Sequence, residues 1–206
     1  MWDIELDRSI FDSAVARATN LRNACHEVAH AVVSELLYLP IRQITVFTDR
    51  DNKLAGGDCS PLGKYRVAHL ESAIITALAG YAFNKLVSKG EWETGNEPIR
   101  RNEMTDMRYA QEMACERLEH FHEPVDEQTS RLLLVARDMV VANWDFILAV
   151  GWDLATVERI TGKEFRKLMV EHRVSYRGSR GVGDIETSRP TTPRRGKEQG
   201  SAAAAV

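Results

Sequence analysis

The apolar residues of this chain fall into helix-like segments, with one strand-like stretch after the first. Between Leu21 and Leu37 they recur at intervals of three and four, which predicts a helix that ends before Pro40. The stretch 41–48, IRQITVFT, is rich in β-branched residues and predicts a strand. Residues 54–59 follow a turn-rich segment and are expected to return as a second short strand.

Further helical patterns follow this hairpin. A second, strongly apolar helix is predicted over residues 66–88. A third is predicted over residues 105–119, and Asn102 or Thr105 would serve as its N-cap.

The sequence after residue 125 also predicts helices. Residues 126–150 predict one long amphipathic helix. After it, Thr161 and Glu164 have the spacing of a capping box, which predicts the start of another helix. The fold class expected is therefore mainly α, with a small β-hairpin or edge strand near residues 41–60.

The chain changes character near its C-terminal end. Residues 175–206 are rich in Gly, Ser, Thr, Pro and Arg and nearly lack large apolar side chains. Such a segment buries too little surface to offset its ordering entropy. We therefore expect a single folded domain over residues 1–174 and a disordered tail over residues 175–206.

Composition narrows the classes of protein that remain. The 206 residues are 44% hydrophobic and 28% charged with a net charge of −3, which does not suggest a nucleic-acid-binding protein. No apolar stretch is long enough for a membrane span, and the acidic N-terminus lacks the pattern of a secretory signal. The widely spaced Cys25, Cys59 and Cys115 form no disulfide framework, so we expect a cytoplasmic protein.

The first helix contains the sequence His26-Glu27-Val28-Ala29-His30, which is an HExxH motif. Positions i and i+4 share one helical face, so both imidazoles can bind one metal ion. The carboxylate between them can take a proton from a zinc-activated water, as in metalloproteases. The competing interpretation is a pair of core histidines beside a surface glutamate.

A catalytic zinc site needs a third protein ligand and an open fourth position. The spacing HExxHxxGxxH is absent, because Val33 and Leu36 stand where Gly and His would be. Glu71, one turn into the second helix, is one candidate. The other candidates are His69, His120, His122, His172, Glu97, Glu103 and Asp106. Spacing alone leaves these alternatives open.

A resemblance to a known family selects among them. The segments CHEVAHAVVSELLYLPIRQITVFT, LESAIITALAGYAFNKL and TDMRYA resemble, in this order, parts of the peptidase domain of FtsH-type AAA zinc proteases. In the third of these segments, the family's aspartate is the third zinc ligand. The resemblance covers about residues 20–170 and implies that His26, His30 and Asp106 bind zinc, with Glu27 as the catalytic base.

The sequence departs from that family in several ways. No GxxxxGK[ST] motif is present, so ATP binding is not expected, and neither is a membrane anchor like that of the family. Ala29 replaces the glycine of the family's HEAGH. Gly95 lies eleven residues before Asp106, a longer spacing than in the family, so His120 and His122 stay as alternative ligands.

The predicted strand Ile41–Thr48 suggests how a substrate would bind. In zincins an extended peptide pairs with an edge strand beside the metal, and the Gly56-Gly57 pair would let a chain approach closely. A simple hairpin turn is the alternative interpretation of the glycines.

These observations predict a zinc metallopeptidase that cleaves peptide bonds in unfolded or flexible polypeptides, without an ATPase of its own. A separate ATPase or adaptor would deliver folded substrates, and the resemblance also implies possible homo-oligomers. No nucleic-acid partner and no membrane span are expected. The alternatives are an inactive binding or regulatory module with the same fold, and a zinc hydrolase of a non-peptide amide.

Overall fold

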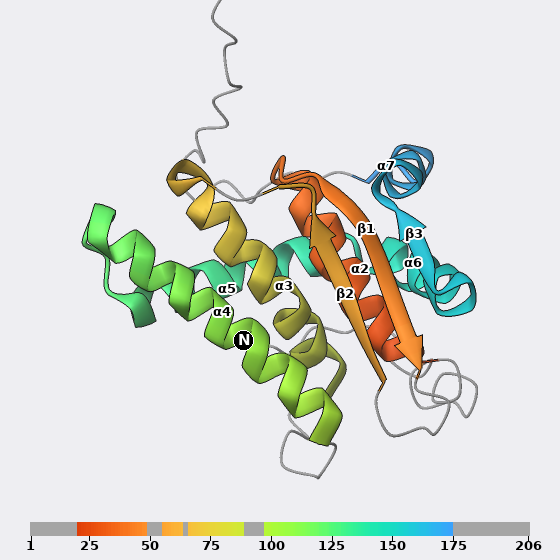
Figure 1. Cartoon of the computed structure of the whole chain (residues 1–206), viewed down its shortest axis with the longest axis horizontal. Coiled ribbons are helices and arrows are strands. Elements are labelled where there is room, and N and C mark those ends of the chain that lie inside the picture. Colours follow the sequence, from red (N-terminus) through yellow and green to blue (C-terminus); the bar gives the residue numbers. More distant parts are fainter. Residues whose placement is uncertain (1–19, 49–54, 64–65, 89–96, 175–206) are drawn as a thin grey trace, which may run out of the picture. The chain divides into compact units, whose positions relative to one another are not determined.

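Two largely buried helices that pack against each other form the centre of the fold (Figure 1). The computed structural model describes residues 20–48, 55–63, 66–88 and 97–174. Helix α2 (Leu21–Leu36) and helix α3 (Leu70–Ser88) agree closely with the two apolar helices predicted from the sequence. Helix α3 buries residues around most of its circumference, as expected for a helix covered by neighbours on several sides.

A three-stranded antiparallel sheet with the strand order β2-β1-β3 lies against α2 (Figure 1). The expected hairpin is present as β1 (Ile41–Thr48) and β2 (Ala55–Pro61). Alternation along β1 follows the pleat, because Ile44 and Val46 are buried while Phe47 is exposed. The fold is thus mainly α with a small β-sheet, as predicted.

The third helix begins earlier than the sequence pattern indicates. Helix α4 spans Glu97–Phe121, so Asn102 and Thr105 lie inside the helix and neither is the residue at which it begins. The first turns of α4, EPIRRNEM, are polar and give no apolar periodicity, although Arg, Glu and Met favour helix and Pro is tolerated in a first turn.

The long helix predicted over residues 126–150 is in fact two helices. Helix α5 (Val125–Ala142) ends at Asn143, and α6 (Trp144–Val157) starts directly after it. The Asn143 side-chain amide donates to the Met139 carbonyl at 2.8 Å, four residues earlier. Asparagine competes for backbone hydrogen bonds in this way, while the apolar pattern continues across the break and hides it.

The C-terminal part of the described chain contains one element that was predicted and one that was not. The capping box of Thr161 and Glu164 is present and starts α7 (Gly162–Glu171). Just before it, strand β3 (Arg159–Thr161) pairs with β1, with Ile44 opposite Ile160. Three residues are too few to give an alternating pattern in the sequence.

All described residues lie in one compact unit, Met1–Tyr176. The expected disordered tail, residues 175–206, lies outside the described residues. Among the helices that the structure describes, none combines the length and the apolar character that a bilayer crossing requires.

Candidate metal centre

Helix α2 places the His26, Glu27 and His30 side chains of the HExxH motif inside the fold. Their exposed fractions are 4%, 5% and 9%, respectively. The imidazoles lie one turn apart, with ring centroids 4.7 Å apart. Burying three ionisable groups is costly without compensating partners, so the neighbouring elements must supply them.

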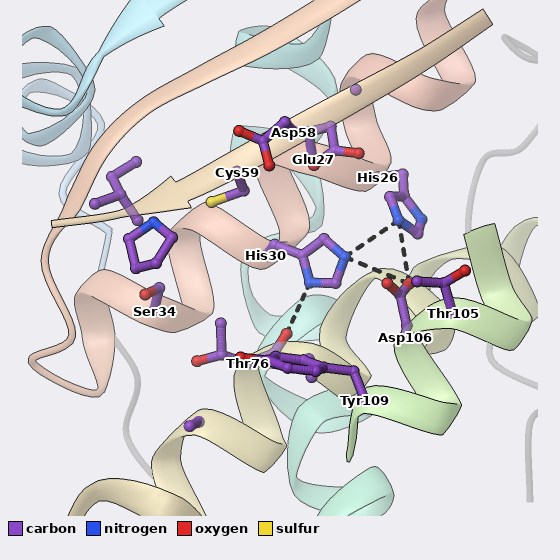
Figure 2. Close-up of a pocket in the computed structure, with 15 residues that line it drawn as sticks. His26, Glu27, His30, Ser34, Asp58, Cys59, Thr76, Thr105, Asp106 and Tyr109 are labelled. Atoms are coloured by element: carbon purple, nitrogen blue, oxygen red, sulfur yellow. Dashed lines mark hydrogen bonds and ion pairs between the residues drawn. The ribbon is translucent and has the colours of Figure 1, made fainter. Parts of the chain in front are cut away.

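Helix α3 supplies partners for both rings from two residues eight positions apart, and Figure 2 shows the first of them, Thr76. The Thr76 carbonyl lies 2.8 Å from Nδ1 of His30, and Nδ2 of Asn84 lies 3.0 Å from Nδ1 of His26. Between them, Gly80 lies so close that an added Cβ would be 2.6 Å from Nε2 of His26. Both Nδ1 atoms therefore face α3, and both Nε2 atoms point to a common place.

Helix α4 brings Asp106 to that place. Its Oδ2 atom lies 3.2 Å from Nε2 of His26 and 3.4 Å from Nε2 of His30, and the two Nε2 atoms are 3.1 Å apart. Oδ2 is buried and makes no hydrogen bond with correct geometry among the described residues. Figure 2 shows the three atoms converging from α2 and α4.

These separations test whether the cluster fits a metal ion. A tetrahedral zinc ion with bonds of about 2.0–2.1 Å holds its ligand atoms about 3.3–3.4 Å apart. The observed edges of 3.1, 3.2 and 3.4 Å are close to these values. The buried group of His26, His30 and Asp106 can therefore hold a metal ion.

Charge within the cluster shifts the pKa values of His30 and Asp106. Burial alone would lower the pKa of His30, but the Asp106 carboxylate outweighs it and raises that pKa to about 9. Burial would likewise raise the pKa of Asp106, but the two imidazoles hold it well below its usual range. The site thus favours a carboxylate facing positive charge, which a cation would also satisfy.

Glu27 is buried beside this cluster but is not one of its three converging ligands. Burial raises the pKa of its carboxyl group, while His26 and His30 partly oppose the shift. Strand β2 passes close to it at Gly57, where an added Cβ would lie 2.7 Å from Oε1 of Glu27. The glycine is needed here for a close approach by the chain's own glutamate.

A cavity of about 350 Å³ adjoins the cluster and is partly open to solvent. Its walls come from α2, the β1–β2 hairpin, α3 and α4. Beyond the ligands and Glu27, its lining includes Ser34, Ile41, Asp58, Cys59, Ala73, Ala77 and Tyr109. A molecule in this cavity would therefore reach both the cluster and Glu27.

The other candidate ligands do not join this group. Glu71 instead accepts from Arg117 at 2.8 Å and from Arg131 at 3.2 Å. His69, His122 and His172 have exposed side chains, and none of the three is part of the cluster. The side chains of Glu97, Glu103 and His120 lie outside the described residues.

The edge strand beside the site is not the one predicted. β1 pairs with β2 on one side and with β3 on the other, so it is central in the sheet. Among the described strands, β2 is the edge next to the cluster, and it carries Gly57 and Asp58 into the cavity wall. The error arose because β3 has too short a pattern to detect.

Sequence reasoning missed the part played by α3. Thr76, Gly80 and Asn84 are spaced by four, the same spacing as the two histidines that they face. This shared spacing of four residues is the signal that could have revealed them. Helices that pack side by side contact each other through rows of residues four positions apart.

Models of known protein families and curated proteins were compared with the chain, and neither comparison found a match.

Proposed function

We propose that this protein is a zinc-dependent metalloendopeptidase related to the peptidase domain of FtsH-type proteases. The observation that carries the proposal is the convergence of two imidazoles and one carboxylate, with a buried glutamate adjoining the same cavity. Two nitrogen ligands and one oxygen ligand suit zinc, and catalytic zinc sites keep a fourth position open.

Bound zinc would supply a Lewis acid that polarises a carbonyl and lowers the pKa of water. Glu27 would take the proton of the attacking water and then pass it to the leaving amine. Burial raises the pKa of the Glu27 carboxyl group, which makes its carboxylate a stronger base for that proton.

The edge strand β2 favours a polypeptide substrate. An extended peptide can add to an exposed sheet edge through backbone hydrogen bonds, and β2 runs along the wall of the cavity. Only an unfolded or flexible segment can take up this extended form. Folded substrates would therefore need a separate ATPase or adaptor.

Replacing Glu27 tests the mechanism. We expect Glu27→Gln to keep its zinc, because the ligands are unchanged, and to lose hydrolysis of an unfolded reporter protein by about 100-fold or more. Glu35→Gln is the matched control on the same helix, since Glu35 instead bonds the Ile41 amide and Arg166. Undiminished hydrolysis in Glu27→Gln would overturn the mechanism.

The wild-type protein in the same assay separates the alternatives. A protein that holds zinc but cleaves no polypeptide would instead be a binding module or a hydrolase of non-peptide amides.

A further inference from the structure

The two histidines of the cluster are held by chemically different partners. Nδ1 of His30 faces the backbone carbonyl of Thr76, and Nδ1 of His26 faces the side-chain amide of Asn84. Asn84 is 3% exposed, so water cannot readily replace its amide as the hydrogen-bond partner of His26. This difference matters because the two partners have different hydrogen-bonding abilities.

A backbone carbonyl can only accept a hydrogen bond. It therefore keeps a proton on Nδ1 of His30, and this leaves Nε2 as the atom that can bind a metal ion. An asparagine amide carries both a donor and an acceptor, which exchange places when the amide turns over. Asn84 can consequently pair with either tautomer of His26.

In the structure, the donor end of the amide faces the ring. Nδ2 of Asn84 donates to Nδ1 of His26 across 3.0 Å, so the neutral ring carries its proton on Nε2. That proton lies on the side of Asp106 Oδ2, 3.2 Å away. In this tautomer Nε2 has no lone pair to offer a metal ion.

We propose that Asn84 is a positioning residue whose amide turns over when the metal binds and so switches the tautomer of His26. With Oδ1 facing the ring, Asn84 accepts from Nδ1–H, and Nε2 becomes a ligand. The amide thus stabilises the metal-free and the metal-loaded site in turn. This inference rests on the metal site of the proposed function and does not depend on peptide hydrolysis.

A carboxylate at this position could only accept. Asn84→Asp is therefore expected to hold His26 in the ligand tautomer before metal arrives and to tighten zinc binding by about tenfold. Asn84→Leu keeps a similar volume but offers neither donor nor acceptor. It is expected to weaken zinc binding by about 10–100-fold, the usual cost of losing such a partner.

The tautomer can be observed directly by NMR of imidazole nitrogens in the metal-free protein, with no substrate present. We expect His26 to be protonated at Nε2 in the metal-free wild type, and at Nδ1 in the zinc-loaded wild type and in metal-free Asn84→Asp. A merely structural role for Asn84 would not move this signal. A metal-free wild type already protonated at Nδ1 of His26 would overturn the inference, whether or not the variants fold.

Zinc affinity, measured by competition with a chromophoric chelator, is the second readout. Asn143→Asp and Asn143→Leu are matched controls, because Asn143 is also a buried asparagine but its side chain donates to the Met139 carbonyl rather than to a residue of the cluster. We expect the controls to bind zinc like the wild type even where they lower stability. An Asn84→Asp affinity equal to that of the wild type would contradict the switch. Peptidase failure with the predicted tautomers and affinities would overturn the proposed function alone.

Discussion

Gly80 lies where any side chain would reach the candidate metal ligands. An added Cβ would be 2.5 Å from Cε1 of His26 and would overlap with Nε2 of His30. On strand β2, a side chain at Gly57 would likewise collide with Glu27 of α2. At the scale of single residues, the site therefore depends on two positions without side chains as well as on the groups that bind.

Gly80→Ala is predicted to impair metal binding without removing a ligand. The two imidazole rings must move apart to admit the methyl group. We therefore expect zinc affinity to fall by about tenfold or more, the usual cost when metal ligands lose their orientation. Gly162→Ala is the control, because its methyl group would meet the Ile41 carbonyl instead. Equal zinc affinity in Gly80→Ala and the wild type would show that the rings are not confined by α3.

The raised pKa of His30 predicts a pH dependence of the metal-free protein. Its folded-state pKa is about 9 against an ordinary value of 6.5, so its stabilisation is complete below about pH 6.5 and is lost as pH rises to about 9. The raised pKa of Glu27 acts in the same direction. We expect the melting temperature of the chelator-treated protein to fall over this range, and to fall less in His30→Gln. A wild-type melting temperature that does not change over this pH range would contradict the raised pKa of His30.

The residues of the candidate site differ in how far the sequence reveals them. His26, Glu27 and His30 form a contiguous motif, so their chemistry can be predicted from spacing alone. Asp106 could be selected only through a family resemblance, because many carboxylates had suitable spacing. Asn84 and Gly80 could not be predicted, since their roles depend on how α3 packs against α2.

At the scale of elements, a network of ion pairs holds the helix that carries Asp106. Arg117 of α4 bonds Glu71 of α3 at 2.8 Å and Glu123, in the turn before α5, at 2.6 Å. Arg131 of α5 bonds the same two carboxylates at 3.2 and 3.0 Å. The side chain of Arg117 is 13% exposed, so its two pairs are shielded from solvent more than ordinary surface pairs, whereas the side chain of Arg131 is 41% exposed.

Arg117→Leu is predicted to lower the free energy of unfolding by about 2 kcal/mol, since two charged hydrogen bonds are lost. Arg108→Leu is the control on the same helix, because its pair with Glu112 is exposed and such pairs contribute about 0.5 kcal/mol or less. Chemical denaturation measures both. Equal losses in the two variants would mean that the network does not anchor α4.

The elements also show where pattern reading fails. The extents of α2, β1 and α3 could be predicted, because buried faces impose a clear period on the sequence. The start of α4 is polar, and the break between α5 and α6 interrupts no apolar period. Neither boundary leaves a trace in the hydrophobic pattern.

For the whole molecule, the ligand cluster joins segments that lie far apart in the chain. His26 and His30 come from the first described helix, and Asp106 comes from α4, which packs on α3. A metal ion bound by all three would bind only the folded chain, so it would stabilise that chain in proportion to its affinity.

The zinc content of the purified protein, measured by elemental analysis, tests the central claim most directly. We expect about one zinc ion per chain in the wild type, its loss in His30→Ala, and weaker retention in Asp106→Ala, because each variant removes one of three ligands. Unchanged zinc retention in Asp106→Ala would assign the third ligand to another residue. A wild-type protein that holds no zinc, even after zinc is supplied, would contradict the account.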